Sequence, residues 1–171
     1  YLIFYTAMLQ NEEIAAMRED YQKHTLEMSD VTENPIVQFA NWFKGALNSS
    51  ELEPNVMTLS TASKSGMPSG RIVLLKGVQD GKFVFYTNYN SRKGTEIAEN
   101  PNAALTFCWL TMQRQVCIQG HQTAYGRGRA VTYRAQSMSA WLPHNVGLSC
   151  AAAFRGDQRA RMSFVTPPFT C

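Results

Sequence analysis

Two cations bracket four apolar residues in the segment Arg71-Ile-Val-Leu-Leu-Lys76. Side chains alternate between the two faces of a strand, so Arg71 and Val73 share one face while Leu74 and Lys76 share the other. The segment therefore places one cation on each face, at opposite ends of the strand. Each cation could bind an anionic group such as a phosphate. Strand-end charges that reach solvent explain the same pattern.

A second group of polar residues spans 86–94, where an expected strand ends and a short helix begins. Ser91 is a suitable N-cap, and Arg92 and Lys93 fall in the first turn of that helix. The helix dipole disfavours cations at this end, but free backbone N–H groups beside Arg and Lys suit a bound phosphate. The segment predicts an anion site, with a solvated loop of surface charges as the alternative.

The third group, Gln113-Arg114-Gln115-Val116, begins another expected strand. A glutamine amide both donates and accepts hydrogen bonds, so it can bind the edge of a heteroaromatic ring. A polar strand face explains this group equally well. Together, the three groups indicate a site for a phosphorylated, planar cofactor.

Metal and nucleophile chemistry find little support in the sequence. No CxxC pair and no cluster of Cys and His is present, which argues against zinc and against a disulfide scaffold and suits a reducing cytosol. We therefore expect no catalytic side chain, no metal and a cytoplasmic protein. No apolar run approaches the roughly 18 residues that span a bilayer, so we expect no membrane partner. The net charge of +3 is too small to indicate nucleic acid by itself.

The elements that must position these groups are a helix and a series of short strands. Asn34-Pro35 is a helix-start signal, and apolar residues at three- and four-residue spacing predict a helix over about 35–48. Asp80-Gly81 predicts a hairpin turn, and Ser91 a helix over 92–99. Strands are expected over 55–63, 70–76, 82–87, 103–109 and 113–119. This order predicts an α+β fold built on an antiparallel barrel.

The composition of the chain changes sharply after Gly120. Residues 121–171 hold six Arg, no Lys and a single acid, Asp157, whereas residues 1–120 contain more acids than bases. The break predicts an atypical Arg-rich tail over 121–171 after a folded domain over 34–120. The polar residues of mixed charge before the helix-start signal predict an N-terminal arm over 1–33.

Four segments, in this order and at these separations, resemble the pyridoxamine 5′-phosphate oxidase family: RIVLLKG, FYTNYNSRKGTE, ENPNAALTFCW and RQVCIQG. Residues 17–21 and 34–42 are similar to the family's arm and first helix, so the resemblance covers about residues 15–120. It implies the FMN-binding split-barrel fold, an antiparallel split β-barrel with flanking helices. It also implies FMN as the cofactor and a homodimer with FMN at the subunit interface.

The resemblance implies a role for each matched residue. Arg71, Arg92 and Lys93 are expected at the FMN phosphate, and Lys76 at the phosphate of the substrate. The positions expected to contact FMN are Arg71, Ile72, Val73, Leu74, Tyr86, Thr87, Arg92, Lys93 and Gln115. The positions expected to contact the substrate are Lys76, Arg18, Tyr21 and Tyr133. The flavin carries the redox chemistry in such enzymes, which agrees with the absence of a nucleophile motif.

The implied reaction is the oxidation of pyridoxamine or pyridoxine 5′-phosphate to pyridoxal 5′-phosphate, with O₂ reduced to H₂O₂, in vitamin B6 salvage. After Gly120 the family's C-terminal motifs are lost. We therefore expect a C-terminally incomplete barrel in which strand 113–119 exposes an unpaired edge. A natural alternative C-terminus or a shifted reading frame would each explain residues 121–171.

Other functions remain open from the sequence. A non-catalytic protein that binds FMN or pyridoxal phosphate would keep the phosphate-binding residues, and an inactive truncated isoform would do the same. A basic tail could also attract nucleic acid, although six arginines over 51 residues are sparse for that role.

Overall fold

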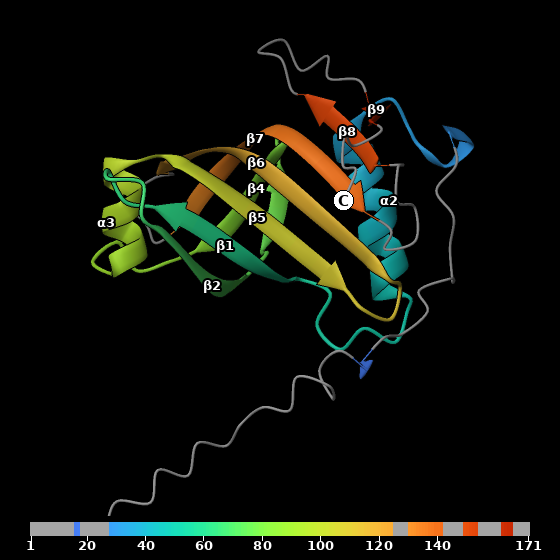
Figure 1. Ribbon diagram of the computed structural model, residues 1–171, viewed down its shortest axis with the longest axis horizontal. Coiled ribbons are helices and arrows are strands. Elements are labelled where there is room, and N and C mark those ends of the chain that lie inside the picture. Colours follow the sequence, from blue (N-terminus) through green and yellow to red (C-terminus); the bar gives the residue numbers. More distant parts are fainter. Residues whose placement is uncertain (1–15, 18–27, 125–129, 142–148, 154–161, 166–171) are drawn as a thin grey trace, which may run out of the picture.

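Nine antiparallel strands form a single sheet, flanked by two helices in the described part of the chain (Figure 1). The computed structural model describes residues 16–17, 28–124, 130–141, 149–153 and 162–165. Most of the predicted arm lies outside these residues. In chain order the elements are η1 (Met28–Asp30), α2 (Pro35–Leu47), β1 (Val56–Ala62), β2 (Pro68–Leu74), β3 (Gly77–Gln79), β4 (Lys82–Tyr86), α3 (Arg92–Glu99), β5 (Asn102–Trp109), β6 (Arg114–Ala124), β7 (Ala130–Trp141), β8 (Ser149–Ala153) and β9 (Met162–Val165).

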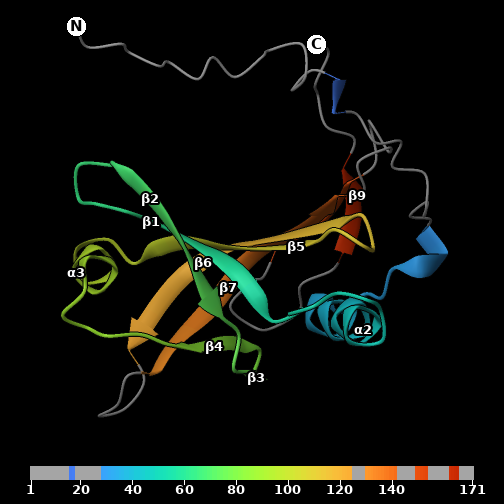
Figure 2. The ribbon, with the colours of Figure 1, turned by 90° about the horizontal axis from the view of Figure 1, so that it is seen from below.

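The strand order is β2-β1-β5-β6-β7-β4-β3, with β8 pairing with β7 and β9 pairing with β8. The sheet is curved, as Figure 2 shows. Just beyond the end of β2, the N–H of Lys76 donates to the carbonyl of Val84 in β4 at 2.8 Å. This hydrogen bond links the segment after β2, at one end of the strand order, to β4, near the other end. The predicted α+β class with antiparallel strands is confirmed.

Helix α2 forms where the sequence predicts it and covers the apolar side of the sheet. The Asn34 side chain accepts a hydrogen bond from the N–H of Ile36 at 2.9 Å, and Pro35 occupies the first turn. Phe39, on the buried face of α2, lies 4.9 Å from Phe83 and 5.1 Å from Phe107 between ring centroids. These aromatic rings are part of the hydrophobic core, which lies between α2 and the sheet.

The predicted Asp-Gly turn is present, but its strands differ from the expectation. Asp80 and Gly81 have φ values of 51° and 69°, as a two-residue hairpin turn requires. The sequence predicts that the turn joins a strand over 70–76 to β4. In the structure the turn joins the short β3 to β4, and the strand in the 70–76 region is β2, which pairs with β1. The strand prediction over 70–76 is therefore shifted, because β2 begins at Pro68, opposite Ala62, directly after a tight turn.

Strand β6 extends well beyond the predicted end at Gln119. The pairing of β6 with β7 continues to Ala124, with a register shift between Gln119 and Gly120. Strand β7 pairs with β6 on one side and with β4 on the other. The prediction of an unpaired edge at 113–119 is wrong, because β7 covers that edge. The expected boundary at Gly120 falls within β6.

Helix α3 spans the predicted residues 92–99. The Ser91 side chain accepts a hydrogen bond from the N–H of Gly94 at 3.4 Å, which confirms the predicted cap. No helix in the described ranges is long and apolar enough to cross a membrane.

Candidate functional site

Two of the predicted phosphate-binding cations meet at a carboxylate where α3 contacts the sheet. Arg71 of β2 lies 3.0 Å from Glu96 of α3, measured from Nη2 to Oε2. Arg92, one turn before Glu96 on α3, lies 2.8 Å from the other carboxylate oxygen, measured from Nε to Oε1. We call Arg71, Arg92 and Glu96 the arginine–glutamate cluster. It joins residues from two of the three groups that the sequence singled out.

Glu96 is buried and densely hydrogen-bonded. The hydroxyls of Thr61 and Ser69 both donate to its Oε2 atom. Thr61 and Ser69 are cross-strand partners on β1 and β2, so strand register brings the two hydroxyls to the same carboxylate. Hydrogen bonds from Ser69, Thr61, Arg92 and Arg71 lower the pKa of Glu96 to about 2, against the opposing effect of burial. Glu96 is therefore ionised at neutral pH.

The two arginines are held differently. Arg71 is largely enclosed, and its Nη1 atom donates to the Leu59 carbonyl at 3.2 Å and to the Thr61 hydroxyl. The Arg92 side chain is 73% exposed and is tied to Glu96 through Nε. No other hydrogen bond of the Arg92 guanidinium occurs among the described residues, so its two terminal nitrogens remain available at the surface.

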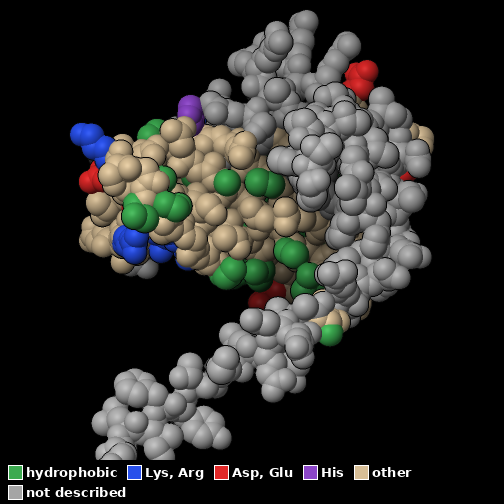
Figure 3. All heavy atoms as spheres, viewed as in Figure 1, with side chains coloured by type: hydrophobic (Ala, Val, Ile, Leu, Met, Phe, Trp, Pro, Cys, Tyr) green, Lys and Arg blue, Asp and Glu red, His purple; other side chains and the backbone are tan. Residues whose placement is uncertain are grey.

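Lys93 follows Arg92 in the first turn of α3 and is partly exposed. Lys and Arg side chains are visible at the α3 end of the molecule in Figure 3. Arg71, Arg92 and Lys93 outnumber the carboxylate of Glu96, so the first turn of α3 and the adjoining part of β2 carry a net positive charge beside a helix N-terminus. That arrangement suits a phosphate group.

A buried hydroxyl without a partner lies on the chain segment between β4 and α3. Thr87 is 6% exposed, and its Oγ1 atom has no hydrogen-bond partner among the described residues. A buried hydroxyl without a partner is costly. Tyr86, the residue before it, is 60% exposed at the end of β4. Thr87 thus presents an unused donor and acceptor, which fits a site that binds a polar ligand.

The predicted FMN contacts on β2 and β6 divide between two faces of the sheet. Val73 packs into the core on the same side as Arg71, as strand alternation predicts. Ile72 and Leu74 lie on the opposite face, where Ile72 is 63% exposed. Gln115 on β6 is exposed too. Ile72, Leu74, Tyr86 and Gln115 therefore do not join the arginine–glutamate cluster.

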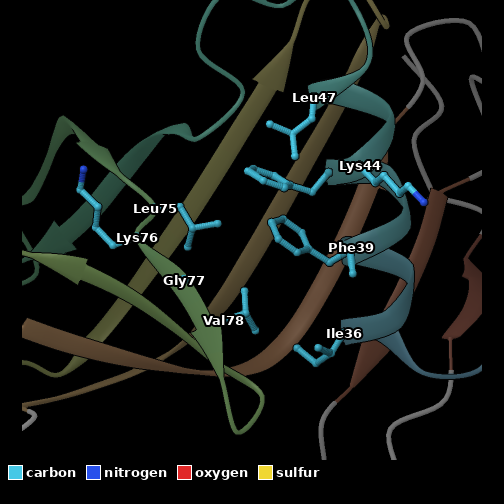
Figure 4. A pocket seen from close by; sticks show the side chains of 10 residues that line it. Ile36, Phe39, Lys44, Leu47, Leu75, Lys76, Gly77 and Val78 are labelled. Atoms are coloured by element: carbon cyan, nitrogen blue, oxygen red, sulfur yellow. The ribbon is translucent and has the colours of Figure 1, made fainter.

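Lys76 lies beyond the end of β2, away from Arg71. It borders a cavity of about 380 Å³ between α2 and the link from β2 to β3. Figure 4 shows Ile36 and Phe39 of α2 facing Leu75 and Val78 across this cavity, while the Lys76 amine points away from α2. The structure thus separates the two cations of the 71–76 segment, as the alternation predicts.

Arg18, Tyr21 and Tyr133 are the remaining predicted substrate contacts. Arg18 and Tyr21 lie outside the described residues. The backbone of Tyr133 pairs with Phe83 and Gln122 in β7, and its side chain is outside the description. Among the described residues, no group of three or more Cys, His, Asp or Glu could hold a metal ion.

Glu96 is the functional candidate that sequence reasoning missed. Its position four residues after Arg92 permits an ion pair on one helix face, which is a local signal. Its contacts with Thr61, Ser69 and Arg71 depend on the packing of α3 against two strands and have no local signal.

Solved structures share this fold. PhzG from Burkholderia lata, crystallised with tetrahydrophenazine-1-carboxylic acid, aligns with a TM-score of 0.71 and 19% identity over 84% of this chain and 98% of its own. A pyridoxamine 5′-phosphate oxidase-related, FMN-binding protein from Nostoc punctiforme aligns with a TM-score of 0.65 and 13% identity over 75% of this chain and 97% of its own. The fold is therefore that of the pyridoxamine 5′-phosphate oxidase-related proteins.

Comparison of the sequences identifies the family as well as the fold. The family pattern described as pyridoxamine 5′-phosphate oxidase matches residues 43–161, and the chain belongs to this family. A pyridoxine/pyridoxamine 5′-phosphate oxidase from Burkholderia thailandensis is 54% identical over 107 residues, which are 63% of this chain and 50% of the relative. The Burkholderia mallei protein of the same description is 53% identical over the same length. The chain spans about half the length of these curated relatives.

Proposed function

We propose that this chain is an FMN-dependent oxidase that converts pyridoxamine or pyridoxine 5′-phosphate to pyridoxal 5′-phosphate, as part of vitamin B6 salvage. The observation that carries the proposal is the meeting of Arg71 and Arg92 at Glu96, beside the N-terminus of α3. The family relationship supports the same assignment.

The FMN phosphate would bind at the α3 end. Arg92 and Lys93 offer exposed cationic donors there, and Thr87 offers a buried hydroxyl without a partner. Ile72, Val73, Leu74, Tyr86 and Gln115 are proposed along the flavin by resemblance. Bound in this way, FMN would supply the redox chemistry of the reaction, in which the substrate is oxidised and O₂ is reduced to H₂O₂.

The substrate phosphate would bind at a separate cation. Lys76 lies past the end of β2 with its amine directed away from α2 (Figure 4), whereas Arg71 contacts Glu96 of α3. One phosphate cannot contact both, so two phosphorylated ligands can be bound and oriented independently. Arg18, Tyr21 and Tyr133 are proposed as further substrate contacts by resemblance.

A homodimer with FMN at the subunit interface is part of this proposal. Ile72 and Tyr86, which are 63% and 60% exposed, are proposed flavin contacts and would be covered when FMN and a second subunit bind. We also propose a cytoplasmic location, because Cys108 and Cys117 are free thiols. Light scattering of the flavin-loaded protein tests the dimer.

Flavin titration followed by a turnover assay tests the function. We expect FMN fluorescence to be quenched on binding and H₂O₂ to be released when pyridoxine 5′-phosphate is added. Lys93→Ala should weaken FMN binding about tenfold, since a charge-assisted hydrogen bond contributes about 1.5–3 kcal/mol, while Lys64→Ala in the exposed β1–β2 turn should not. FMN binding without peroxide release would favour a non-catalytic flavin-binding protein. No FMN binding would refute the proposal.

A further inference from the structure

The function proposed above assigns no cofactor or substrate contact to Glu96, the acidic member of the arginine–glutamate cluster. Glu96 is 5% exposed, and its two carboxylate oxygens accept hydrogen bonds from four side chains. Those side chains come from β1, β2 and α3. A carboxylate in this position fixes the placement of any cation that contacts it.

We infer that Glu96 is a positioning residue that holds the Arg71 and Arg92 guanidinium groups in place for the FMN phosphate. The inference rests on the proposed function, since it concerns the same site. It adds a residue that would not touch the cofactor and would act through the two arginines.

The geometry of Arg92 is the main support. An exposed arginine samples many rotamers, and holding it in one costs conformational entropy. Arg92 donates to Glu96 through Nε alone, at 2.8 Å, and both of its terminal nitrogens are without a hydrogen bond among the described residues. These two nitrogens form the fork that binds phosphate oxygens in a bidentate manner. Glu96 therefore orients Arg92 without occupying the donors that a phosphate needs.

The geometry of Arg71 gives the second support. Its Nη2 atom donates to Glu96 at 3.0 Å and to the Ser69 hydroxyl at 2.6 Å. Its Nη1 atom donates to Leu59, Thr61 and Ser69 as well, so the guanidinium is fixed at the contact between β2 and α3 and contributes positive charge, not a free terminal donor, to a phosphate bound nearby. Glu96 links the two arginines although they are far apart in the sequence. Leu59, Thr61 and Ser69 also hold Arg71, so the carboxylate acts mainly by placing Arg92 beside an arginine that is already fixed.

The charge of the cluster is consistent with this role. Arg71, Arg92 and Lys93 contribute three positive charges and Glu96 one negative charge. The net charge of these four residues is opposite in sign to that of a phosphate monoester, which carries about −1.5 to −2 at neutral pH. Without Glu96 the three cations would repel one another when no ligand is bound.

The test compares FMN with riboflavin, which is the same flavin without the phosphate. We expect Glu96→Gln to weaken FMN binding about tenfold, the effect of one charge-assisted hydrogen bond, and to leave riboflavin affinity unchanged. Glu99→Gln, which removes an exposed carboxylate from the same helix, is the matched control and should change neither affinity. The FMN-to-riboflavin affinity ratio is the readout, because a purely structural role would lower both affinities together.

Equal losses for FMN and riboflavin would overturn the inference and assign Glu96 to fold stability alone. Unchanged FMN affinity would overturn it as well. A rise in FMN affinity would also overturn it, since Glu96 would then compete with the phosphate for the arginines. If the wild-type chain fails to bind FMN, the proposed function fails first, and the inference fails with it. Wild-type FMN binding therefore separates the two failures.

Discussion

Gly94 and the carbonyl oxygen of Tyr89 are so close that a Cβ atom at position 94 would lie 2.1 Å from that oxygen. The neighbour is backbone, which cannot rotate away as a side chain would. The segment that leads from β4 into α3 is therefore packed tightly against the first turn of the helix. This packing fixes the place of Arg92 and Lys93 relative to Thr87.

The first prediction follows from that contact. Gly94→Ala should lower the free energy of unfolding by about 1–3 kcal/mol, the usual range for overpacking, and should weaken FMN binding because the segment from β4 to α3 must move. Urea denaturation and flavin titration measure the two effects. Gly77→Ala is the control, since a Cβ there meets nothing within 4 Å. Equal stability of the two variants would contradict the packing argument.

Thr87→Val should have opposite effects on stability and on cofactor binding. The Thr87 hydroxyl is buried without a described partner, so replacing it with a methyl group should leave the Tm of the cofactor-free protein unchanged or raise it. The FMN dissociation constant should increase, because the hydroxyl is proposed to bind the cofactor. Thr61→Val provides the contrast: it removes a hydrogen bond to Glu96 and should lower the Tm. A lower Tm in Thr87→Val would show that the hydroxyl has a partner in the folded chain.

Lys76→Met should separate the binding of substrate from the binding of flavin. Arg71 lies in the middle of β2 and Lys76 beyond its end, so the loss of the amine should weaken pyridoxal 5′-phosphate binding and leave FMN binding near normal. Isothermal titration with each ligand distinguishes the two. Lys44→Met, on α2 beside the same cavity, is the control. Loss of FMN binding with intact pyridoxal phosphate binding would reverse the proposed roles.

Stability should depend on pH through Glu96. Its pKa is lowered from 4.5 to about 2 in the folded protein, so the unfolded chain binds a proton at a higher pH than the folded one. The stabilisation by the ionised carboxylate is complete above about pH 5 and is lost as the pH falls towards 2. The difference in Tm between wild type and Glu96→Gln should therefore shrink between pH 5 and pH 2. A constant difference across this range would mean that the carboxylate's charge does not stabilise the fold.

Phe39→Ala should be the most destabilising of these changes. Phe39 is 2% exposed and contacts the rings of Phe83 and Phe107, so truncation should cost about 3–5 kcal/mol. Leu47→Ala, at a 60% exposed position near the end of the same helix, should stay within about 0.5 kcal/mol of wild type. Urea denaturation measures both values. A small effect at Phe39 would show that α2 is not part of the cooperative core.

The sequence by itself determined the features that depend on neighbouring residues. Asn34 and Ser91 start the two helices through side-chain caps, and Asp80-Gly81 forms its hairpin turn because that dipeptide tolerates positive φ. Alternation along the 71–76 segment correctly separated Arg71 from Lys76. The order of the motifs was sufficient to indicate the family.

Only the tertiary structure decided which distant segments meet. The β2 strand pairs with β1 and not with β4, and β7 covers the edge that the sequence suggested was open. The carboxylate of Glu96 reaches Arg71 across 25 residues because α3 packs on β1 and β2. Such contacts depend on which strands pair and on how a helix packs against them. Several segments of similar composition could serve equally well as the pairing partner. No local pattern distinguishes the correct partner, so the arrangement of the site is set when the strands pair and α3 packs on them.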